Sequence, residues 1–575
     1  MATAGATVSF DRYTLNDYET TFADRHLLHG NIEKWAKETP DALAIVEVET
    51  GREISYEYFD RVATALAIKL IDLGFQKGDF FASSLPLIAQ HVFLEYACFK
   101  VGVIFAPLDL RLKGPEVIRS LSLIKAKGFA FLGPTPVADF RELGKLVQQE
   151  APYVEHLLQF SPPEETIAGA TSVYSLVGEL MPWLADPTSA PRYRDYRARH
   201  EAIQETDGAL VIYTTGSTGY PKPALLCHRG ITCQNMAVLG AFRLDRYRKA
   251  LINVPPSHVA CQAAQMMGCF FHGSTAYMMR IFDPKGTLDA IEKYQIESVG
   301  QIPAMFAMEW RVPEFADHDH SSIEFLCYGG QGASVPMIER MKEMCPQVAT
   351  GLGLTEMSGF VTYTTPGAPT EEIADSVGWP APVTPLSIRM PMNEDGSAGE
   401  ELSAGTIGDI CFRGPQVFLG YVNDPAATAK TISKEGILYT GDLGYVDDRG
   451  LHYTGRSKLV IKPKGYQVFP GQVEEHFSLL REKVSACAAV GAPHDVFTEG
   501  IVLFVEKHPG IEILIADLDQ HAMGVAAYMR PCHFEILDSG TLPLNRVAKT
   551  DYVTLKQRAM ELIVELRQKG RWDCS

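Results

Sequence analysis

The chain has little positive charge, no patterned cysteines and no long uninterrupted apolar run. Among its 575 residues, 52 Lys and Arg stand against 70 Asp and Glu, which gives a net charge of −18. A surface of that sign repels nucleic acids and anionic membranes, so we expect neither as a partner. Any phosphate-bearing ligand must therefore be held by local cations and backbone amides.

The cysteines and the apolar stretches exclude further classes of protein. The eleven cysteines include no CxxC pair, and an odd number cannot pair completely. We therefore predict neither a disulfide framework nor a zinc site, and most cysteines should be small core side chains. The first twenty residues lack the apolar core of a signal peptide, and the most apolar stretch, 261–279, is interrupted by polar residues. We expect a cytoplasmic protein without a membrane span.

Helical and strand-like patterns alternate along most of the chain, which predicts an α/β fold. Helices are expected over 27–37, 88–100 and 555–569, and after Ser55, which can cap a helix that Gly74 closes. Apolar runs predict strands at 42–47, 101–105, 210–212, 250–254, 297–302, 323–328, 408–412, 451–454, 486–490 and 501–505. Residues 161–206 are rich in Pro, Glu, Ala and Arg, and we expect an irregular surface connection there.

These patterns predict two domains. A large N-terminal domain, 1–457, should hold two α/β subdomains and, beyond Gly378, a small β-barrel-like subdomain. A smaller α+β C-terminal domain should span 458–575, a usual domain size.

The stretch ALVIYTTGSTGYPKP, 209–223, has the features of a phosphate-binding loop. An apolar run typical of a buried parallel strand enters a segment of hydroxyls and glycines and then a lysine. The residues that can donate to or approach a phosphate are Thr214, Thr215, Gly216, Ser217, Thr218, Gly219 and Lys222. A solvated turn is the alternative, but strand, loop and lysine follow in the order that phosphate binding needs. Because Pro223 follows the lysine, the Walker pattern of P-loop NTPases is excluded.

Five separated motifs together resemble the adenylate-forming superfamily of acyl-CoA synthetases, carrier-protein adenylation domains and luciferases. They are YTTGSTGYPKP, GLGLTE (351–356), LYTGDLGYVDDRG (438–450), TGRSKLVIKPKGYQVFPGQVEE (454–475) and LPLNRVAK (542–549). The resemblance spans nearly the whole chain, in family order. The chain departs from the family pattern at Pro223, Leu352, Leu459 and Ala548, where glycine, an aromatic residue, an acidic residue and glycine are usual.

The resemblance implies the site residues. Besides the loop residues from Thr214 to Gly219, it assigns ATP and AMP binding to Gly330, Gln331, Gly332, Gly351, Leu352, Gly353, Leu354, Thr355, Asp442 and Arg456. It assigns catalysis to Lys549, Glu356 and Lys222, with Glu356 also the Mg²⁺ ligand. His258 and Gly465 would contact the acid and the coenzyme A arm, and Lys458 would be the hinge about which a mobile C-terminal domain rotates.

The implied reaction joins a carboxylic acid to a thiol in two steps, with ATP, Mg²⁺ and coenzyme A. Rival functions are a stand-alone adenylation enzyme that loads a separate carrier protein, a luciferase-like oxygenase, and a nucleotide-binding module without catalysis. The final DCS lacks the SKL address of the luciferase branch, and a binding module would not need Lys549. The presumed pocket segments, 259–265, 327–332 and 352–359, carry no cation for a second carboxylate, so we expect an aromatic, alicyclic or medium-chain monocarboxylic acid. Whether the chain forms a homodimer is left open.

Overall fold

The structure of the chain is a computed structural model that describes residues 13–214, 221–246, 248–456, 459–463, 466, 468–545 and 549–573. The described residues form two compact units. The first unit holds 13–214, 221–386 and 412–438, and the second holds 387–411 and the described residues from 439 onward. The domain boundary predicted between 457 and 458 falls at residues outside the described part and stays a prediction.

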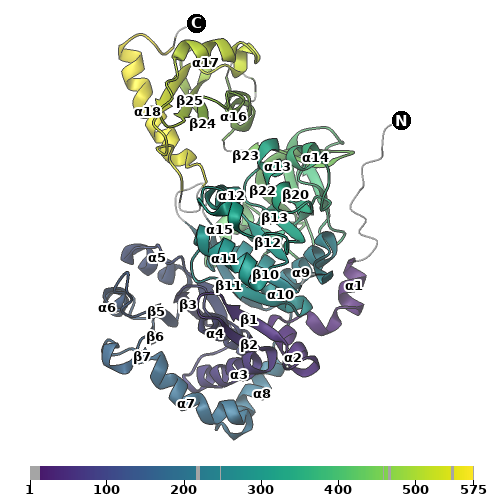
Figure 1. Ribbon diagram of the computed structural model, residues 1–575, viewed down its shortest axis with the longest axis vertical. Coiled ribbons are helices and arrows are strands. Elements are labelled where there is room, and N and C mark those ends of the chain that lie inside the picture. Colours follow the sequence, from purple (N-terminus) through teal and green to yellow (C-terminus); the bar gives the residue numbers. More distant parts are fainter. Residues whose placement is uncertain are drawn as a thin grey trace. The chain divides into compact units, whose positions relative to one another are not determined.

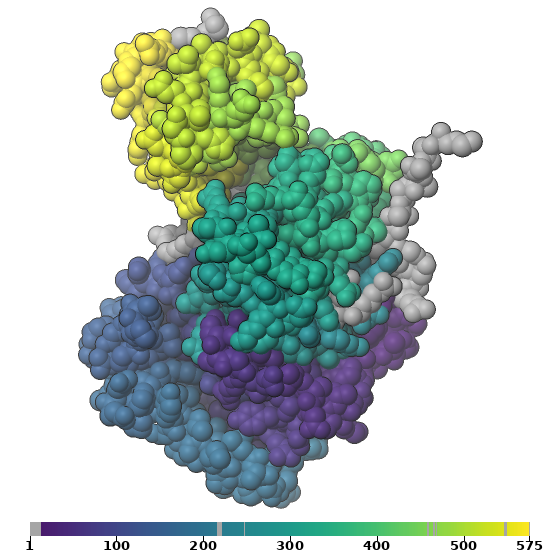
Figure 2. All heavy atoms as spheres, viewed as in Figure 1, coloured from purple at the N-terminus to yellow at the C-terminus, as the bar shows by residue number. Residues whose placement is uncertain are grey.

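One sheet of the first unit has the strand order β14-β13-β12-β10-β11-β1-β2 (Figure 1). Its strands are β1 (Leu43–Glu47), β2 (Arg52–Ser55), β10 (Lys249–Ile252), β11 (Thr275–Met278), β12 (Ser298–Gln301), β13 (Phe325–Tyr328) and β14 (Val348–Ala349). They pair in parallel except β1 with β2. The β1–β11 pair explains why the purple N-terminal surface adjoins the teal surface in Figure 2.

The other large sheet of the first unit has the order β21-β9-β8-β4-β3-β5-β6-β7. Its strands are β3 (Phe80–Ser84), β4 (Ile104–Pro107), β5 (Gly128–Leu132), β6 (His156–Phe160), β7 (Thr171–Ser172), β8 (Gly208–Thr214), β9 (Lys222–Cys227) and β21 (Gly420–Tyr421). The predicted parallel strand at 210–212 is parallel on one edge only. β8 pairs in parallel with β4, but its other neighbour, β9, is antiparallel.

Helices pack around these sheets. They are α1 (Leu15–Thr20), α2 (Leu28–Glu38), α3 (Tyr56–Asp72), α4 (Ala89–Val101), α5 (Gly114–Ile124), α6 (Arg141–Glu150), α7 (Val173–Ala185), α8 (Tyr193–Glu201), α9 (His228–Phe242), α10 (Met267–His272), α11 (Pro284–Tyr294), α12 (Pro303–Glu309), α13 (Val335–Met344), α14 (Thr370–Asp375) and α15 (Pro425–Ala429). The predicted cap is confirmed, because the Ser55 hydroxyl accepts the Tyr58 amide hydrogen at the start of α3.

The prediction of an irregular connection over 161–206 is wrong, because α7 and α8 lie there. Ser172 caps α7, and Leu176 and Leu180, one helical turn apart, are its buried residues. Apolar side chains also occupy the exposed face of α7, namely Tyr174, Val177 and Met181. They blur the amphipathic period, which explains why the helix is hard to recognise in the sequence.

The second unit contains two sheets. One has the order β19-β20-β22-β23, formed by β19 (Leu386–Arg389), β20 (Gly408–Phe412), β22 (Leu438–Asp447) and β23 (Gly450–Arg456). The other joins β24 (Val484–His494), β25 (Thr498–Lys507) and β26 (His533–Leu537). The helices of this unit are α16 (Pro470–Ser478), α17 (Ile515–Ala522) and α18 (Tyr552–Gln568).

β25 is buried on both faces. Ile501, Leu503 and Val505 join a core that includes residues of α16 and α17. Val502 and Phe504, which point to the opposite face, join a core that includes residues of α18. A continuous apolar run, rather than an alternating one, is the pattern that such a two-sided strand requires.

Two expectations from composition can be compared with the structure. Every described cysteine is free, and all but Cys487 and Cys532 are buried, which confirms them as core side chains. In the part of the chain that the structure describes, we find no helix with the length and apolar character needed to cross a membrane.

Candidate functional site

The phosphate-loop lysine lies at the start of an antiparallel strand. Thr214, the last residue of β8, pairs with Lys222, the first residue of β9. Thr215, Gly216, Ser217, Thr218 and Gly219, which join them, lie outside the described residues. The Lys222 ammonium lies 5.0 Å from the centre of the Tyr421 ring, within the range of a cation–π interaction.

Close backbone contacts shape the GLGLTE segment. A Cβ at Gly351 would lie 1.9 Å from the Thr362 carbonyl oxygen, so only glycine fits there. The Leu352 amide donates to the Thr362 hydroxyl at 2.9 Å. Gly353 and Leu354 form the short strand β15, which pairs with β16 (Gly359–Phe360). These contacts fix the backbone that leads to Thr355 and Glu356.

Thr355 and Glu356 lie in a single 3₁₀ turn, Thr355–Met357. The Glu356 carboxylate accepts a hydrogen bond of 2.6 Å from the Tyr421 hydroxyl. The Glu356 carbonyl accepts a second bond, from the Phe418 amide at 2.9 Å. Lys222 and Glu356, two of the three predicted catalytic residues, therefore meet around Tyr421.

The glycines predicted to line the adenine follow β13 at the carboxyl edge of the first sheet, where open α/β sheets bind ligands. Gly330 has φ +79°, which suits glycine, and a Cβ at Gly332 would meet nothing within 4 Å. A Cβ at Gly329 and one at Gly351 would each lie 3.2 Å from the Phe360 ring. Phe360 thus supplies an aromatic surface next to both glycine segments, although Leu352 replaces the usual aromatic residue.

His258 lies in the segment that follows β10. Its amide donates to the Pro255 carbonyl at 3.1 Å. Burial raises the pKa of Asp109, but hydrogen bonds from Arg111, together with the charge of Arg111 and the electrostatic interaction with His258, bring that pKa below its usual range. The electrostatic contact places His258 near the loop after β4, a neighbourhood that the sequence did not predict.

The second unit brings two predicted ribose contacts together. Asp442 on β22 lies opposite Arg456 on β23. The Arg456 Nε lies 3.3 Å from the Asp442 Oδ1, and Asp442 is only 6% exposed. Within β22, Gly441 has φ +76°, and the Thr440 hydroxyl accepts the Asp442 amide hydrogen at 3.1 Å. The strand register therefore brings the two residues of this pair together.

Lys549 belongs to the same electrostatic neighbourhood, although it lies far along the chain. Asn545 holds its backbone, because the Asn545 amide donates to the Lys549 carbonyl at 2.7 Å and the Asn545 side chain accepts the Lys549 amide hydrogen at 3.1 Å. Burial lowers the pKa of Lys549, and Arg456 lowers it further, while Asp442 raises it. The second unit thus gathers Asp442, Arg456 and Lys549. Lys458 and Gly465 lie outside the described residues.

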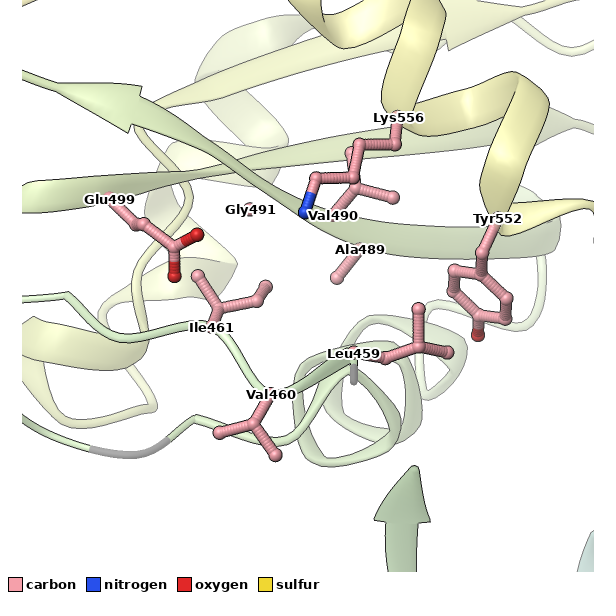
Figure 3. Close-up of a pocket in the computed structure, with 9 residues that line it drawn as sticks. All are labelled: Leu459, Val460, Ile461, Ala489, Val490, Gly491, Glu499, Tyr552 and Lys556. Atoms are coloured by element: carbon pink, nitrogen blue, oxygen red, sulfur yellow. The ribbon is translucent and has the colours of Figure 1, made fainter. Parts of the chain in front are cut away.

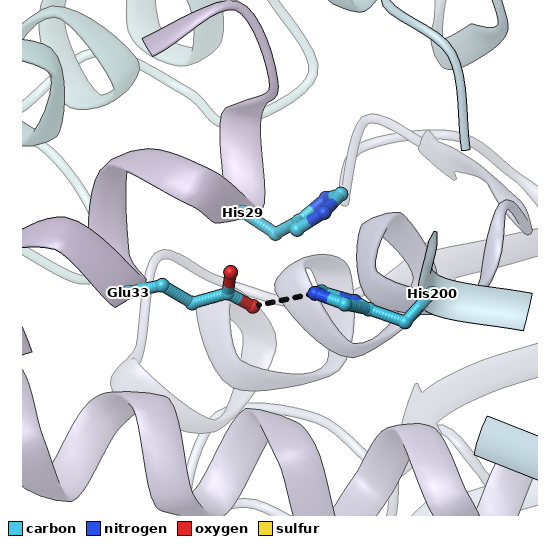
Figure 4. A group of neighbouring side chains, drawn as sticks. All are labelled: His29, Glu33 and His200. Carbon is cyan, nitrogen blue, oxygen red and sulfur yellow. Dashed lines mark ion pairs between the residues drawn. The ribbon is translucent and has the colours of Figure 1, made fainter. Parts of the chain in front are cut away.

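A further group in the first unit has the composition of a metal site. The potential ligand atoms of His29, Glu33 and His200 all lie within 4.8 Å of one another (Figure 4). Lys100, which is 1% exposed, pairs with Glu33 and lies 2.8 Å from the Asp60 carboxylate. A metal ion would face that buried ammonium at close range, and the repulsion disfavours it. We interpret the group as an ionic network that links α2, α3, α4 and α8.

The second unit contains a small cavity next to the predicted hinge (Figure 3). Its lining consists of Leu459, Val460, Ile461, Ala489, Val490, Gly491, Glu499, Tyr552 and Lys556. Its volume of about 20 Å³ has room for about one water molecule. It is too small to hold any of the expected substrates.

Sequence reasoning missed Tyr421, Phe360 and Asp109. Each lies outside the five motifs, so the spacing of residues within a motif carries no signal for it. The segment LGYVNDP, 419–425, does hold a positive-φ residue, Asn423, and a helix start at Pro425, which mark a shaped loop. The run Asn-Asp-Pro in this segment is typical of a turn, and it is the sequence signal that could have drawn attention to Tyr421.

Comparison with known proteins shows the family of the chain. Residues 32–422 match the family model described as AMP-binding enzyme. The putative acyl-CoA ligase YdaB of Bacillus subtilis is 28% identical over 91% of this chain and 97% of its own. Feruloyl-CoA synthase of an Amycolatopsis species is 28% identical over 80% of this chain and 84% of its own. The structure of ATP-bound MatB from Rhodopseudomonas palustris aligns with a TM-score of 0.77, at 21% identity over 94% of this chain and 99% of that one.

The fold and the family match define an adenylate-forming enzyme. The chain belongs to the AMP-binding enzyme family, because the matched region covers more than half of its residues. The predicted α/β fold, a large N-terminal part followed by a smaller C-terminal one, is confirmed by the structural match.

Proposed function

We propose that this protein is an AMP-forming acid–thiol ligase. A substrate carboxylate oxygen attacks the α-phosphorus of ATP, and pyrophosphate leaves to give an acyl-adenylate. The thiol of coenzyme A then attacks the acyl carbon, and AMP leaves to give the thioester. Membership of the AMP-binding enzyme family and the names of the two relatives support the proposal.

The observation that carries the proposal is the meeting of Asp442, Arg456 and Lys549 in the second unit. The Asp442 carboxylate offers two acceptor oxygens for the ribose hydroxyls, and Arg456 contacts ribose and phosphate. The long stem of Lys549 carries a compact charge toward the forming bond between carboxylate and α-phosphorus. Burial has already removed part of the water around the Lys549 ammonium, which lowers its pKa, so less water remains to be displaced when substrates close around it.

In the first unit, Lys222 and Glu356 act on the phosphates. Two anions must approach in the first step, so their repulsion has to be neutralised before an in-line attack. Lys222 supplies one positive charge next to the phosphate loop. Gly330, Gln331, Gly332 and the segment from Gly351 to Leu354 hold the nucleotide, with the Phe360 ring beside them.

The donor set next to Lys222 fits Mg²⁺. Glu356 offers a carboxylate and Thr355 a hydroxyl, both oxygen donors, from one partly exposed 3₁₀ turn. When bound, the ion would neutralise phosphate charge and orient the triphosphate. Glu356 would hold the ion through its carboxylate, which the hydrogen bond from Tyr421 and the bond to its own carbonyl orient.

For the acid, we propose an aromatic, alicyclic or medium-chain monocarboxylate. The segment after His258 forms a π-helix, Ala260–Met266, whose side chains are mostly buried and carry no charge. The name of the feruloyl-CoA synthase relative favours the aromatic option. Rotation about Lys458, with Gly465 against the coenzyme A arm, and a cytoplasmic location remain predictions, and the oligomeric state stays open.

One experiment tests the proposal against its main rival. The purified protein is incubated with ATP, Mg²⁺ and a panel of acids, with either coenzyme A or a phosphopantetheinylated carrier protein, and the thioesters are identified by mass spectrometry. We expect an acyl-CoA and an equal amount of AMP. A thioester formed on the carrier protein alone would mean that the carrier protein, and not coenzyme A, is the acceptor. A dicarboxylate or an amino acid as the best substrate would overturn the proposed acid class.

A further inference from the structure

We propose that Tyr421 is a positioning residue that holds the Glu356 carboxylate and the Lys222 ammonium around one side chain, and so sets the metal and phosphate contacts of the first half-reaction. The inference rests on the proposed function of Glu356 and Lys222. It adds a residue that none of the five sequence motifs includes.

Tyr421 makes two different contacts with two different parts of its side chain. Its hydroxyl donates to the Glu356 Oε1 at 2.6 Å, a short bond of the charge-assisted kind. Its ring centre lies 5.0 Å from the Lys222 Nζ. The hydroxyl therefore orients the carboxylate, and the ring face supports the ammonium. Because the contacts use different atoms, substitution can remove one without the other.

The backbone around Tyr421 is tied to both partners' segments. We call residues 418–422 the strap. On one side, the Phe418 amide donates to the Glu356 carbonyl at 2.9 Å. On the other, the Leu419 amide donates to the Leu225 carbonyl at 2.8 Å, and the Val422 amide to the Pro223 carbonyl at 2.9 Å. The strap is thus hydrogen-bonded to β9, which begins at Lys222, and to the turn that carries Glu356.

The side chain itself has little freedom. The Tyr421 amide donates to the Thr428 hydroxyl at 2.9 Å, and the Phe418 ring packs edge-on against the Tyr421 ring, 4.9 Å between centres. The hydroxyl is therefore held where it donates to the Glu356 carboxylate at 2.6 Å.

A purely structural role is the alternative, since a buried tyrosine also stabilises its surroundings. The two roles predict different responses to the metal. A structural tyrosine affects folding and lowers activity at every Mg²⁺ concentration alike. A positioning tyrosine changes the Mg²⁺ concentration that half-saturates the enzyme, because the carboxylate that holds the ion is no longer oriented.

The test compares Tyr421→Phe, which keeps the ring, with Tyr421→Leu, which removes both contacts. Tyr56→Phe is the matched control, because the Tyr56 hydroxyl donates to the Ser274 carbonyl at 2.7 Å in the buried core of the same unit. Mg²⁺ dependence of acyl-adenylate formation is measured together with Mn²⁺ binding to the ATP-loaded protein by electron paramagnetic resonance, a readout that needs no turnover.

We expect Tyr421→Phe to raise the half-saturating Mg²⁺ concentration and weaken Mn²⁺ binding by about 3- to 10-fold, with KM for ATP nearly unchanged. Tyr421→Leu should also raise KM for ATP, and Tyr56→Phe should change neither metal readout. The positioning role alone would be overturned if the wild-type enzyme adenylates acids and the Tyr421→Phe variant has the same Mg²⁺ dependence as the wild-type enzyme. Absence of metal-dependent ATP binding in the wild-type protein would overturn this inference and the proposed function together.

Discussion

The two clusters of predicted site residues are built in different ways. In the first unit, Lys222 and Glu356 are oriented by backbone hydrogen bonds and by one shared aromatic side chain. In the second unit, Asp442 and Arg456 face each other across two paired strands. Lys549, whose backbone is hydrogen-bonded to Asn545, interacts with both through charge. The arrangement of the first cluster therefore depends on one side chain, that of Tyr421, whereas that of the second depends on the pairing of β22 with β23.

The largest expected effect comes from the second cluster. Lys549→Ala should slow acyl-adenylate formation by about 100- to 1,000-fold, because it removes a charge aimed at the transition state. Conversion of supplied acyl-adenylate and coenzyme A to thioester should stay near the wild-type rate. Both half-reactions are measured separately, with Lys556→Ala as a lysine control in the same unit. Near-normal adenylation by Lys549→Ala would remove the catalytic role.

The next effect tests the first cluster. Glu356→Gln keeps the bulk of the side chain and removes its charge, so adenylation should fall by about 10- to 100-fold and need more Mg²⁺. Glu401→Gln, at the exposed partner of Arg389, is the control. A Mg²⁺ titration on both variants is the measurement, and identical curves would contradict the assignment of Glu356 to the metal.

A smaller effect is expected at Arg456. Arg456→Lys keeps the charge and loses the planar guanidinium, so KM for ATP should rise by about 5- to 10-fold with a smaller change in kcat. Arg389→Lys, which alters a surface pair in the same unit, should leave KM unchanged. If both variants behaved alike, the Asp442–Arg456 pair would serve the sheet rather than the nucleotide.

The last prediction concerns stability instead of rate, and it separates the two units by their response to pH. His91 and His228 lie in the first unit, and burial lowers the pKa of each to about 4, below the usual value near 6.5. Between those values the unfolded chain binds more protons, so the free energy of unfolding falls as pH drops from about 6.5 to about 4. Each histidine can contribute roughly 3 kcal/mol over that window. Urea unfolding measured at pH 7 and at pH 4.5 should give a lower free energy of unfolding for the first unit at pH 4.5. Equal free energies at the two pH values would contradict the prediction.

Much of the fold follows from the sequence because burial leaves a local pattern. The run Ile501–Val505 is apolar at every position, and its strand is buried on both faces. The helix after Ser55 has a cap and a helical period. α7 lacks such a signal because apolar residues also occupy its exposed face. β9, the antiparallel partner of β8, was not predicted as a strand, although the seven residues between Thr214 and Lys222 are too few for a parallel crossover.

The candidate site was less accessible to sequence reasoning. Motif resemblance named Asp442, Arg456 and Lys549, but only the fold places them in one neighbourhood. Tyr421 and Glu356 lie 65 residues apart, and nothing in either segment records their 2.6 Å hydrogen bond. Contacts of this kind are set by how distant strands pair, which is a property of the whole sheet.

The central claim is that ATP is cleaved between its α- and β-phosphates by attack of an acid. The most direct measurement is exchange of labelled pyrophosphate into ATP in the absence of coenzyme A, with nucleotide products followed by chromatography. We predict exchange that requires a monocarboxylic acid, and AMP as the nucleotide product once coenzyme A is added. ADP and inorganic phosphate as products, or exchange that no acid stimulates, would contradict the account.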